Sequence, residues 1–130
     1  MPAVLSALNA AVDLPSVPRS VPAARRVVTH LLTAWAAEGY RDDAALLVSE
    51  LVTNVVRHVA GEAAMTVEVH LTQTALQVAV VDGSTTLADA RPPTAQGGHG
   101  LWLVAAVADR WGSEEHGRGK RVWFELRATK

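Results

Sequence analysis

Three polar side chains, Glu50, Asn54 and His58, follow one another at intervals of four along a stretch whose spacing predicts a helix. At about 100° per residue they form one stripe over roughly 80° of the helix surface. A carboxamide oxygen there can ligate a hard cation, and a carboxylate one turn away can orient or deprotonate a nucleophile. The alternative is the solvated face of an amphipathic helix. Asn54 counts against that alternative, because asparagine inside a helix costs roughly several tenths of a kcal/mol relative to alanine.

A second candidate is Asp82, which follows an apolar stretch and precedes Gly83 and Ser84. A carboxylate at the end of a strand can accept a hydrogen bond from a base amine, a charge-assisted bond worth about 1.5–3 kcal/mol. The alternative is a plain Asp-Gly turn, which the same residues favour. The sequence leaves both interpretations open at this point.

A third candidate is the run Gly97-Gly98-His99-Gly100, which opens an apolar helix. Small residues let successive backbone amides point at an anion, and the dipole of the helix favours negative charge at its N-terminus. An ordinary glycine-rich hinge has the same composition. The run Gly117-Arg118-Gly119-Lys120 is different, because it lacks the glycine spacing and the Ser or Thr of a phosphate-binding loop. We interpret it as a hairpin turn.

The elements that must position these residues follow from hydrophobic periodicity. A period near 3.6 predicts helices, and strict alternation predicts strands joined without helices between them, hence antiparallel. A long segment without periodicity, residues 84–98, is typical of a lid or binding loop. The expected order is a possible edge strand at 10–14, helices at 21–39 and 42–59, strands at 65–71 and 75–81, a helix at 100–108, and strands at 110–114 and 121–127.

This order predicts an α+β fold, a two-layer α/β sandwich with a mainly antiparallel mixed sheet and the helices on one face. Residues 1–19, rich in Ala, Pro and Ser, are expected to form an N-terminal arm, and residues 20–130 the folded domain. At 130 residues the chain suits a single domain.

Composition narrows the class of protein. Twelve Lys and Arg against 13 Asp and Glu give a net charge of −1, which argues against a dedicated nucleic-acid binder. The absence of cysteine excludes disulfides, cysteine-ligated zinc and thiol catalysis. No stretch approaches the ~20 apolar residues of a membrane span, and the N-terminus has no pattern of a secretory signal. We therefore expect a cytoplasmic protein without direct contacts to nucleic acid or membrane.

Three motifs in this order make the chain resemble the GHKL ATPases, which share the Bergerat ATP-binding fold. The motifs are Glu50-x-x-x-Asn54-x-x-x-His58, Asp82-Gly83-Ser84 and Gly98-His99-Gly100-Leu101. The nearest branch is that of the small stand-alone anti-sigma factor serine kinases, and the resemblance covers about residues 20–128. It implies ATP and Mg²⁺ as ligands. It also implies site roles, in order: Glu50 as general base or orienting group, Asn54 as Mg²⁺ ligand, His58 in a supporting role, Asp82 and Gly83 at the adenine, and Gly98, His99, Gly100 and Leu101 at the phosphates.

The resemblance further implies partners. The substrate would be a serine on an anti-sigma factor antagonist, the sequestered protein a sigma factor, and the kinase a homodimer. This chain departs from the family pattern at three places: Thr85 replaces a glycine, Lys120-Arg121 replace a threonine of the late strand, and Arg91 is the one lid cation. A non-catalytic, ATP-sensing regulatory binding module therefore stays open as the alternative to a kinase.

Overall fold

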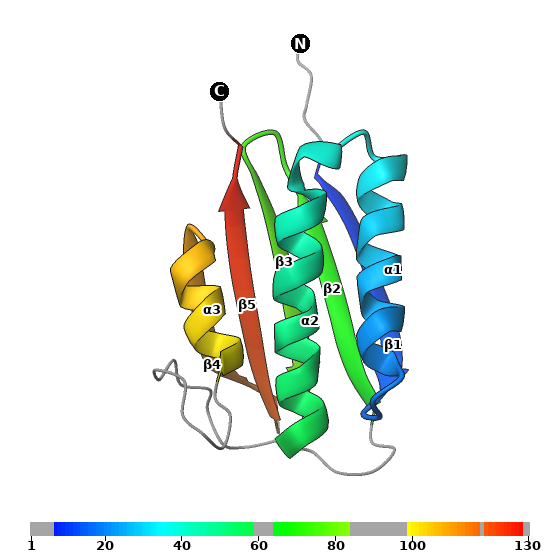
Figure 1. Cartoon of the computed structure of the whole chain (residues 1–130), viewed down its shortest axis with the longest axis vertical. Coiled ribbons are helices and arrows are strands. Elements are labelled where there is room, and N and C mark those ends of the chain that lie inside the picture. The colour runs from blue at the N-terminus through cyan, green and yellow to red at the C-terminus, as the bar shows by residue number, and fades with distance from the viewer. Residues whose placement is uncertain (1–6, 59–63, 84–98, 118, 129–130) are drawn as a thin grey trace.

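The computed structural model of the chain describes residues 7–58, 64–83, 99–117 and 119–128. Within them the polypeptide forms one sheet and a layer of helices (Figure 1). The elements are β1 (Leu8–Pro15), α1 (Ser20–Ala34), a 3₁₀ turn η1 (Glu38–Tyr40), α2 (Arg41–His58), β2 (Ala64–Leu71), β3 (Ala75–Asp82), α3 (His99–Val107), β4 (Arg110–His116) and β5 (Gly119–Arg127).

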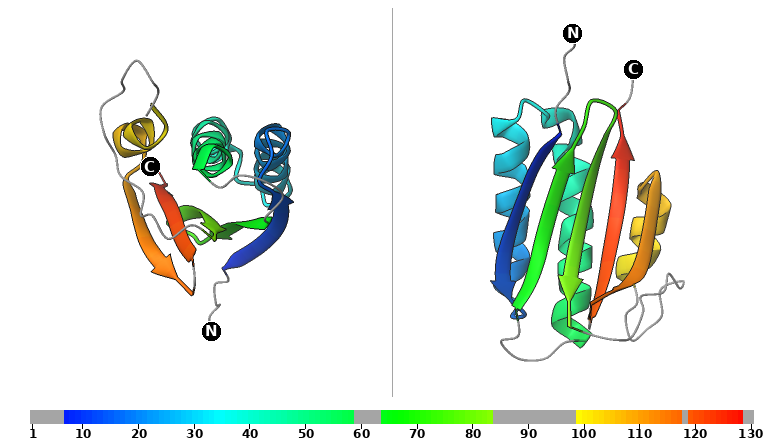
Figure 2. Two further views of the ribbon diagram at one scale, coloured as in Figure 1. Left: turned by 90° about the horizontal axis from the view of Figure 1, so that it is seen from below. Right: turned by 180° about the vertical axis from the view of Figure 1, so that it is seen from behind.

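The five described strands form one sheet in the order β1-β2-β3-β5-β4, and each neighbouring pair is antiparallel. The three α-helices lie side by side over one face of this sheet, with α2 between α1 and α3 (Figures 1 and 2). The predicted two-layer α+β sandwich is confirmed. One detail of that prediction differs: among the described strands no pair is parallel, so the sheet is antiparallel rather than mixed.

The core lies between the sheet and the helices. In β2 the buried positions alternate, as a strand with one face toward a core requires, and β3 follows the same pattern except that Ala79 is also buried. On the helix side, the stripe of α2 that the 3.6-residue period predicts supplies the matching apolar surface. The largest fully buried side chains are Phe124, Leu32, Leu47, Leu51, Met65, Leu76, Val28, Val48, Val52, Val55, Val67 and Val69.

Helix α1 ends five residues before the predicted terminator Gly39, and that prediction is wrong. Ala36 takes the left-handed backbone conformation instead, with φ 57°. The Ala37 amide donates to the Leu32 carbonyl (2.7 Å) and the Ala36 amide to the Thr33 carbonyl (3.1 Å). These two bonds form a Schellman motif, in which glycine is the usual left-handed residue. Gly39 instead lies in η1, the separate turn that leads into α2.

Strand β1 is longer than the edge strand expected at residues 10–14. It pairs with β2 over its whole length, from Leu8 opposite Leu71 to Pro15 opposite Ala64. Polar pairs support the pairing, because Thr66 Oγ1 donates to Asp13 Oδ1 (2.7 Å) and His70 Nδ1 bonds Asn9 Oδ1. Residues 8–15 therefore belong to the sheet, while the domain boundary placed after residue 19 stays a prediction.

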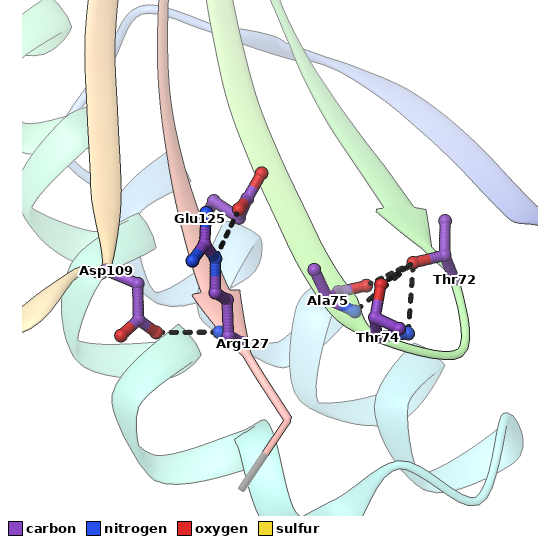
Figure 3. A network of polar contacts seen from close by, with 6 residues as sticks. All are labelled: Thr72, Thr74, Ala75, Asp109, Glu125 and Arg127. Carbon is purple, nitrogen blue, oxygen red and sulfur yellow. Dashed lines mark hydrogen bonds and ion pairs between the residues drawn. The ribbon is translucent and has the colours of Figure 1, made fainter.

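Polar contacts close the end of the sheet where the β2–β3 turn lies (Figure 3). Thr72 Oγ1 accepts hydrogen bonds from the amides of Thr74 (3.3 Å) and Ala75 (3.2 Å), which shapes the predicted polar turn. The Arg127 amide donates to Asp109 Oδ2 (2.7 Å) and ties the end of β5 to the start of β4. The other end of the sheet, where β3 ends, carries the candidate site.

Candidate functional site

Four elements reach the same end of the sandwich. The last turns of α2, the end of β3, the start of β5 and the start of α3 all lie at the lower end of the molecule in Figure 1. The strand pairing explains part of this, because β3 and β5 are antiparallel and Asp82 at the end of β3 faces Lys120 at the start of β5. The sequence motifs on α2, β3 and α3 are thereby brought to one place.

The polar stripe of Glu50, Asn54 and His58 lies on the side of α2 that faces away from α1. Arg25 of α1 donates a hydrogen bond from Nε to Ser49 Oγ (3.0 Å), so the Ser49 side of α2 faces α1. Glu50, Asn54 and His58 lie about 100°, 140° and 180° further round the helix axis. Asn54 and His58 therefore lie on the side of α2 that faces away from α1, and α3 is the helix that follows α2 on that side (Figure 1).

Burial separates the three stripe residues. Glu50 and Asn54 are half-buried, whereas His58, the last residue of α2, is exposed. The carboxylate of Glu50 and the carboxamide of Asn54 are thus one turn apart and only partly exposed. The alternative interpretation of this helix predicted a fully solvated face. Their roles at a ligand stay a prediction.

The start of α3 provides backbone donors. His99 and Gly100 form its first residues, and the Leu101 side chain is 6% exposed within the core while its amide belongs to the first turn. The first amides of a helix have no partner inside the helix and favour an anion. Gly98 and the predicted lid at residues 84–98 lie outside the described residues.

Asp82 lies on the face of the sheet that the helices cover. Val78 and Val80 precede it in the same alternation and belong to the core, and Asp82 itself is 5% exposed. Gly83, which follows, is exposed. A carboxylate in the core position of a strand is costly unless its charge is compensated. An exposed Asp-Gly turn does not account for this burial.

A compensating charge comes from Lys120, a residue of the predicted turn that lies in β5 instead. Its Nζ lies 4.0 Å from Asp82 Oδ2, and the side chains of Lys120 and Asp82 are 3% and 0% exposed. The predicted hairpin between β4 and β5 is confirmed, because His116 pairs with Gly119. The signal for Lys120 was nevertheless present, since it begins an alternation that continues with the buried residues Val122, Phe124 and Leu126.

Gly119 allows β5 to start this close to β3. A Cβ on Gly119 would stand 1.8 Å from the backbone carbonyl oxygen of Asp82 and 2.9 Å from Cα of Gly83. Real side chains do not approach a backbone oxygen so closely, so only glycine fits. This contact holds Lys120 in register with Asp82.

These groups fit a magnesium nucleotide. Mg²⁺ prefers oxygen and is usually held by one or two protein oxygens together with phosphates, and Asn54 offers a half-buried carboxamide oxygen. The amides at the start of α3 suit phosphate oxygens, and Asp82 suits an amino group. Asp82 is closed to solvent in this structure, so contact with a base would require the groups that cover it to move.

A comparison with protein families shows the family of the chain. A family model described as the histidine kinase-like ATPase domain matches residues 14–126 of the 130. This chain belongs to that family. A search of curated proteins finds no significant match. Histidine kinase-like ATPase domains of the GHKL type bind ATP, usually with Mg²⁺, and membership suggests an ATP-dependent kinase or ATPase activity.

The matched range of the histidine kinase-like ATPase domain includes Glu50, Asn54, Asp82 and Lys120. Two open hollows of about 570 and 560 Å³ lie elsewhere, along β strands, and share His70 and Gln77 in their walls. Neither contains a residue of the candidate site. In the part of the chain that the structure describes, no helix is long and apolar enough to cross a bilayer.

Proposed function

We propose that this histidine kinase-like ATPase domain is an ATP-dependent protein serine/threonine kinase of a bacterial partner-switching system. Its substrate is an anti-sigma factor antagonist, and its second partner is a sigma factor that it sequesters. The observation that carries the proposal is the pair Glu50 and Asn54, half-buried one turn apart in the half of α2 that leads to the end of the sandwich where Asp82 lies. A module that only binds ATP has no use for a carboxylate beside the phosphates.

Each residue has a defined part in the transfer. Asp82 accepts a hydrogen bond from the 6-amino group of adenine, which favours ATP over GTP. The amides at the start of α3 bind phosphate oxygens, with His58 in support at the end of α2. Asn54 would hold the Mg²⁺, and the bound ion would supply positive charge that offsets the charge of the phosphates.

Glu50 orients the attacking serine hydroxyl and accepts its proton. The serine oxygen forms a bond to the γ-phosphorus, and the bond from the γ-phosphorus to the β–γ bridging oxygen breaks. ADP leaves, and the proton passes from Glu50 to solvent. Most of the rate enhancement in such a transfer comes from positioning and from charge stabilisation.

The experiment is phosphotransfer from γ-labelled ATP with Mg²⁺ to candidate antagonist proteins encoded nearby. Phosphoserine on one of them, absent with Glu50→Gln, supports the kinase. ATP binding by calorimetry without transfer to any candidate would instead favour the alternative, an ATP-sensing regulatory binding module. Failure to bind ATP would contradict both functions.

The resemblance to anti-sigma factor kinases also supports a homodimer as the working form. Sedimentation at micromolar concentration tests it directly. A sedimentation coefficient of a monomer, with and without ATP, contradicts the dimer. Co-purification with a sigma factor, lost on addition of the unphosphorylated antagonist, is the result expected for partner switching.

A further inference from the structure

Lys120 and Asp82 form a buried ion pair at the end of the site where the base of a nucleotide would lie. They are direct partners in the pairing of β5 with β3, and the absence of a side chain on Gly119 allows the two strands to approach this closely. Nζ and Oδ2 are 4.0 Å apart, and both side chains are almost completely buried. The pair is therefore held on rigid strands, as a recognition site requires.

Stability alone does not account for such a pair. Taking two charges out of water is costly, and replacing a buried ion pair by apolar side chains of similar size is often neutral or stabilising. The neighbouring pair of core residues on the same face of these two strands consists of two valines, Val80 in β3 and Val122 in β5. The charged pair begins where the core meets the candidate site.

The pair presents two complementary functions side by side. A carboxylate is an acceptor only, whereas an ammonium carries three donors, so one contact with Asp82 leaves capacity for others. The 6-amino group of adenine is a donor flanked by two ring nitrogens, N1 and N7, that are acceptors. An acceptor and a donor on neighbouring strands match this edge of the base.

We propose that Lys120 is a second base-reading residue, whose ammonium donates a hydrogen bond to a ring nitrogen beside the amino group that Asp82 accepts from. This inference rests on the proposed ATP binding and deepens it. Asp82 selects the amino group, and Lys120 selects the adjacent ring nitrogen. Nucleotide recognition then depends on two strands rather than on one carboxylate.

Calorimetric titration of the whole chain with ATP, 1-deaza-ATP and 7-deaza-ATP tests this without any substitution. The first analogue lacks N1 and the second lacks N7. We expect one of them to bind about tenfold or more weakly than ATP, as the loss of a charge-assisted hydrogen bond predicts. If both analogues bind within about threefold of ATP, the inference is wrong, although ATP binding itself stands.

The variant Lys120→Met tests whether the difference in affinity between ATP and the weaker analogue depends on the Lys120 ammonium. It removes the ammonium at similar length, so the affinities for ATP and the weaker analogue should converge to within about threefold. Arg121→Met is the matched control, because Arg121 lies next in β5 and contacts Glu68 and Gln77 on the opposite face. It should leave the ratio unchanged.

A ratio that persists in Lys120→Met would contradict the inference even if ATP still binds. Circular dichroism confirms that each variant is folded, and Lys120→Gln replaces Lys120→Met if the latter is not. If wild-type protein binds no adenine nucleotide, the proposed function fails as well, which separates the two failures.

Discussion

The backbone carbonyl oxygen of Asp82 occupies the space in which a side chain on Gly119 would begin, 1.8 Å from an ideal Cβ. Gly119→Ala should therefore lower the free energy of unfolding by at least about 2 kcal/mol, because β5 must move away from β3. Gly83→Ala is the matched control, since a Cβ there meets nothing within 4 Å. Urea denaturation measures both, and equal midpoints would contradict the close approach.

The buried ion pair makes a different prediction for stability. Asp82→Leu alone leaves the Lys120 ammonium buried without its partner carboxylate and should cost about 3–5 kcal/mol of unfolding free energy. Asp82→Leu combined with Lys120→Met removes both charges and should recover most of this loss. Additive losses in the double variant would show that the two charges do not interact.

The end of α1 offers a stabilising substitution. Ala36 has φ 57°, where an L-residue pays a penalty that glycine does not. Ala36→Gly should raise the free energy of unfolding by about 1 kcal/mol. The control Ala34→Gly, in the last turn of α1 and exposed, should lower it by about 0.5–1 kcal/mol. A thermal melt that ranks the two variants the other way would refute the Schellman motif.

Tyr40 is the only tyrosine in the chain, so its phenol can be titrated by absorbance alone. Burial, and secondly the negative charge of Asp109, raise the pKa of Tyr40 above its ordinary value of 10.0. Above pH 10 the folded state therefore binds more protons than the unfolded state, and the free energy of unfolding falls as the pH rises. Asp109→Asn should lower the pKa partly, because burial remains. A titration at the ordinary value would contradict the burial.

The proposed role of Glu50 is tested by the phosphotransfer kinetics of a variant. Glu50→Gln should retain ATP affinity within about threefold and lower the rate of phosphotransfer by about 10²–10⁴. Thr53→Ala, also half-buried on α2, is the control and should change neither. Full turnover by Glu50→Gln would remove Glu50 from the mechanism.

Much of the fold could be predicted because its periodicities are clean. The alternation from Met65 to Leu71 predicts a half-buried strand, and the structure has β2 over Ala64–Leu71. The order of helices and strands then leaves few packings, of which helices on one face of an antiparallel sheet is the simplest. Local pattern and overall architecture agree here, which is why the prediction succeeded.

The end of α1 could not be predicted, because two competing terminators lie close together. Gly39 has the better intrinsic preference, but the chain must turn earlier to begin η1 and α2, and Ala36 takes the strained conformation. Packing of the two helices outweighs a local penalty of about 1–2 kcal/mol.

The motifs of the site were evident from residue type and spacing, but their environment was not. Nothing in the run Asp82-Gly83 tells a buried carboxylate from an exposed turn. The partner that decides this, Lys120, lies in a distant strand, and a lysine beside two glycines indicates a turn before it indicates a core position. Charge compensation is a tertiary property, so the sequence alone could name Asp82 but not its counterion.

The strand order has a consequence for how the protein is made. β5 follows β4 in the chain but lies between β4 and β3 in the sheet, so among the described strands β4 joins the sheet only through β5. During synthesis, residues up to His116 can leave the ribosome before Lys120, the buried counterion of Asp82, has been added. In a nascent chain, Asp82 thus cannot pair with Lys120 until β5 has emerged.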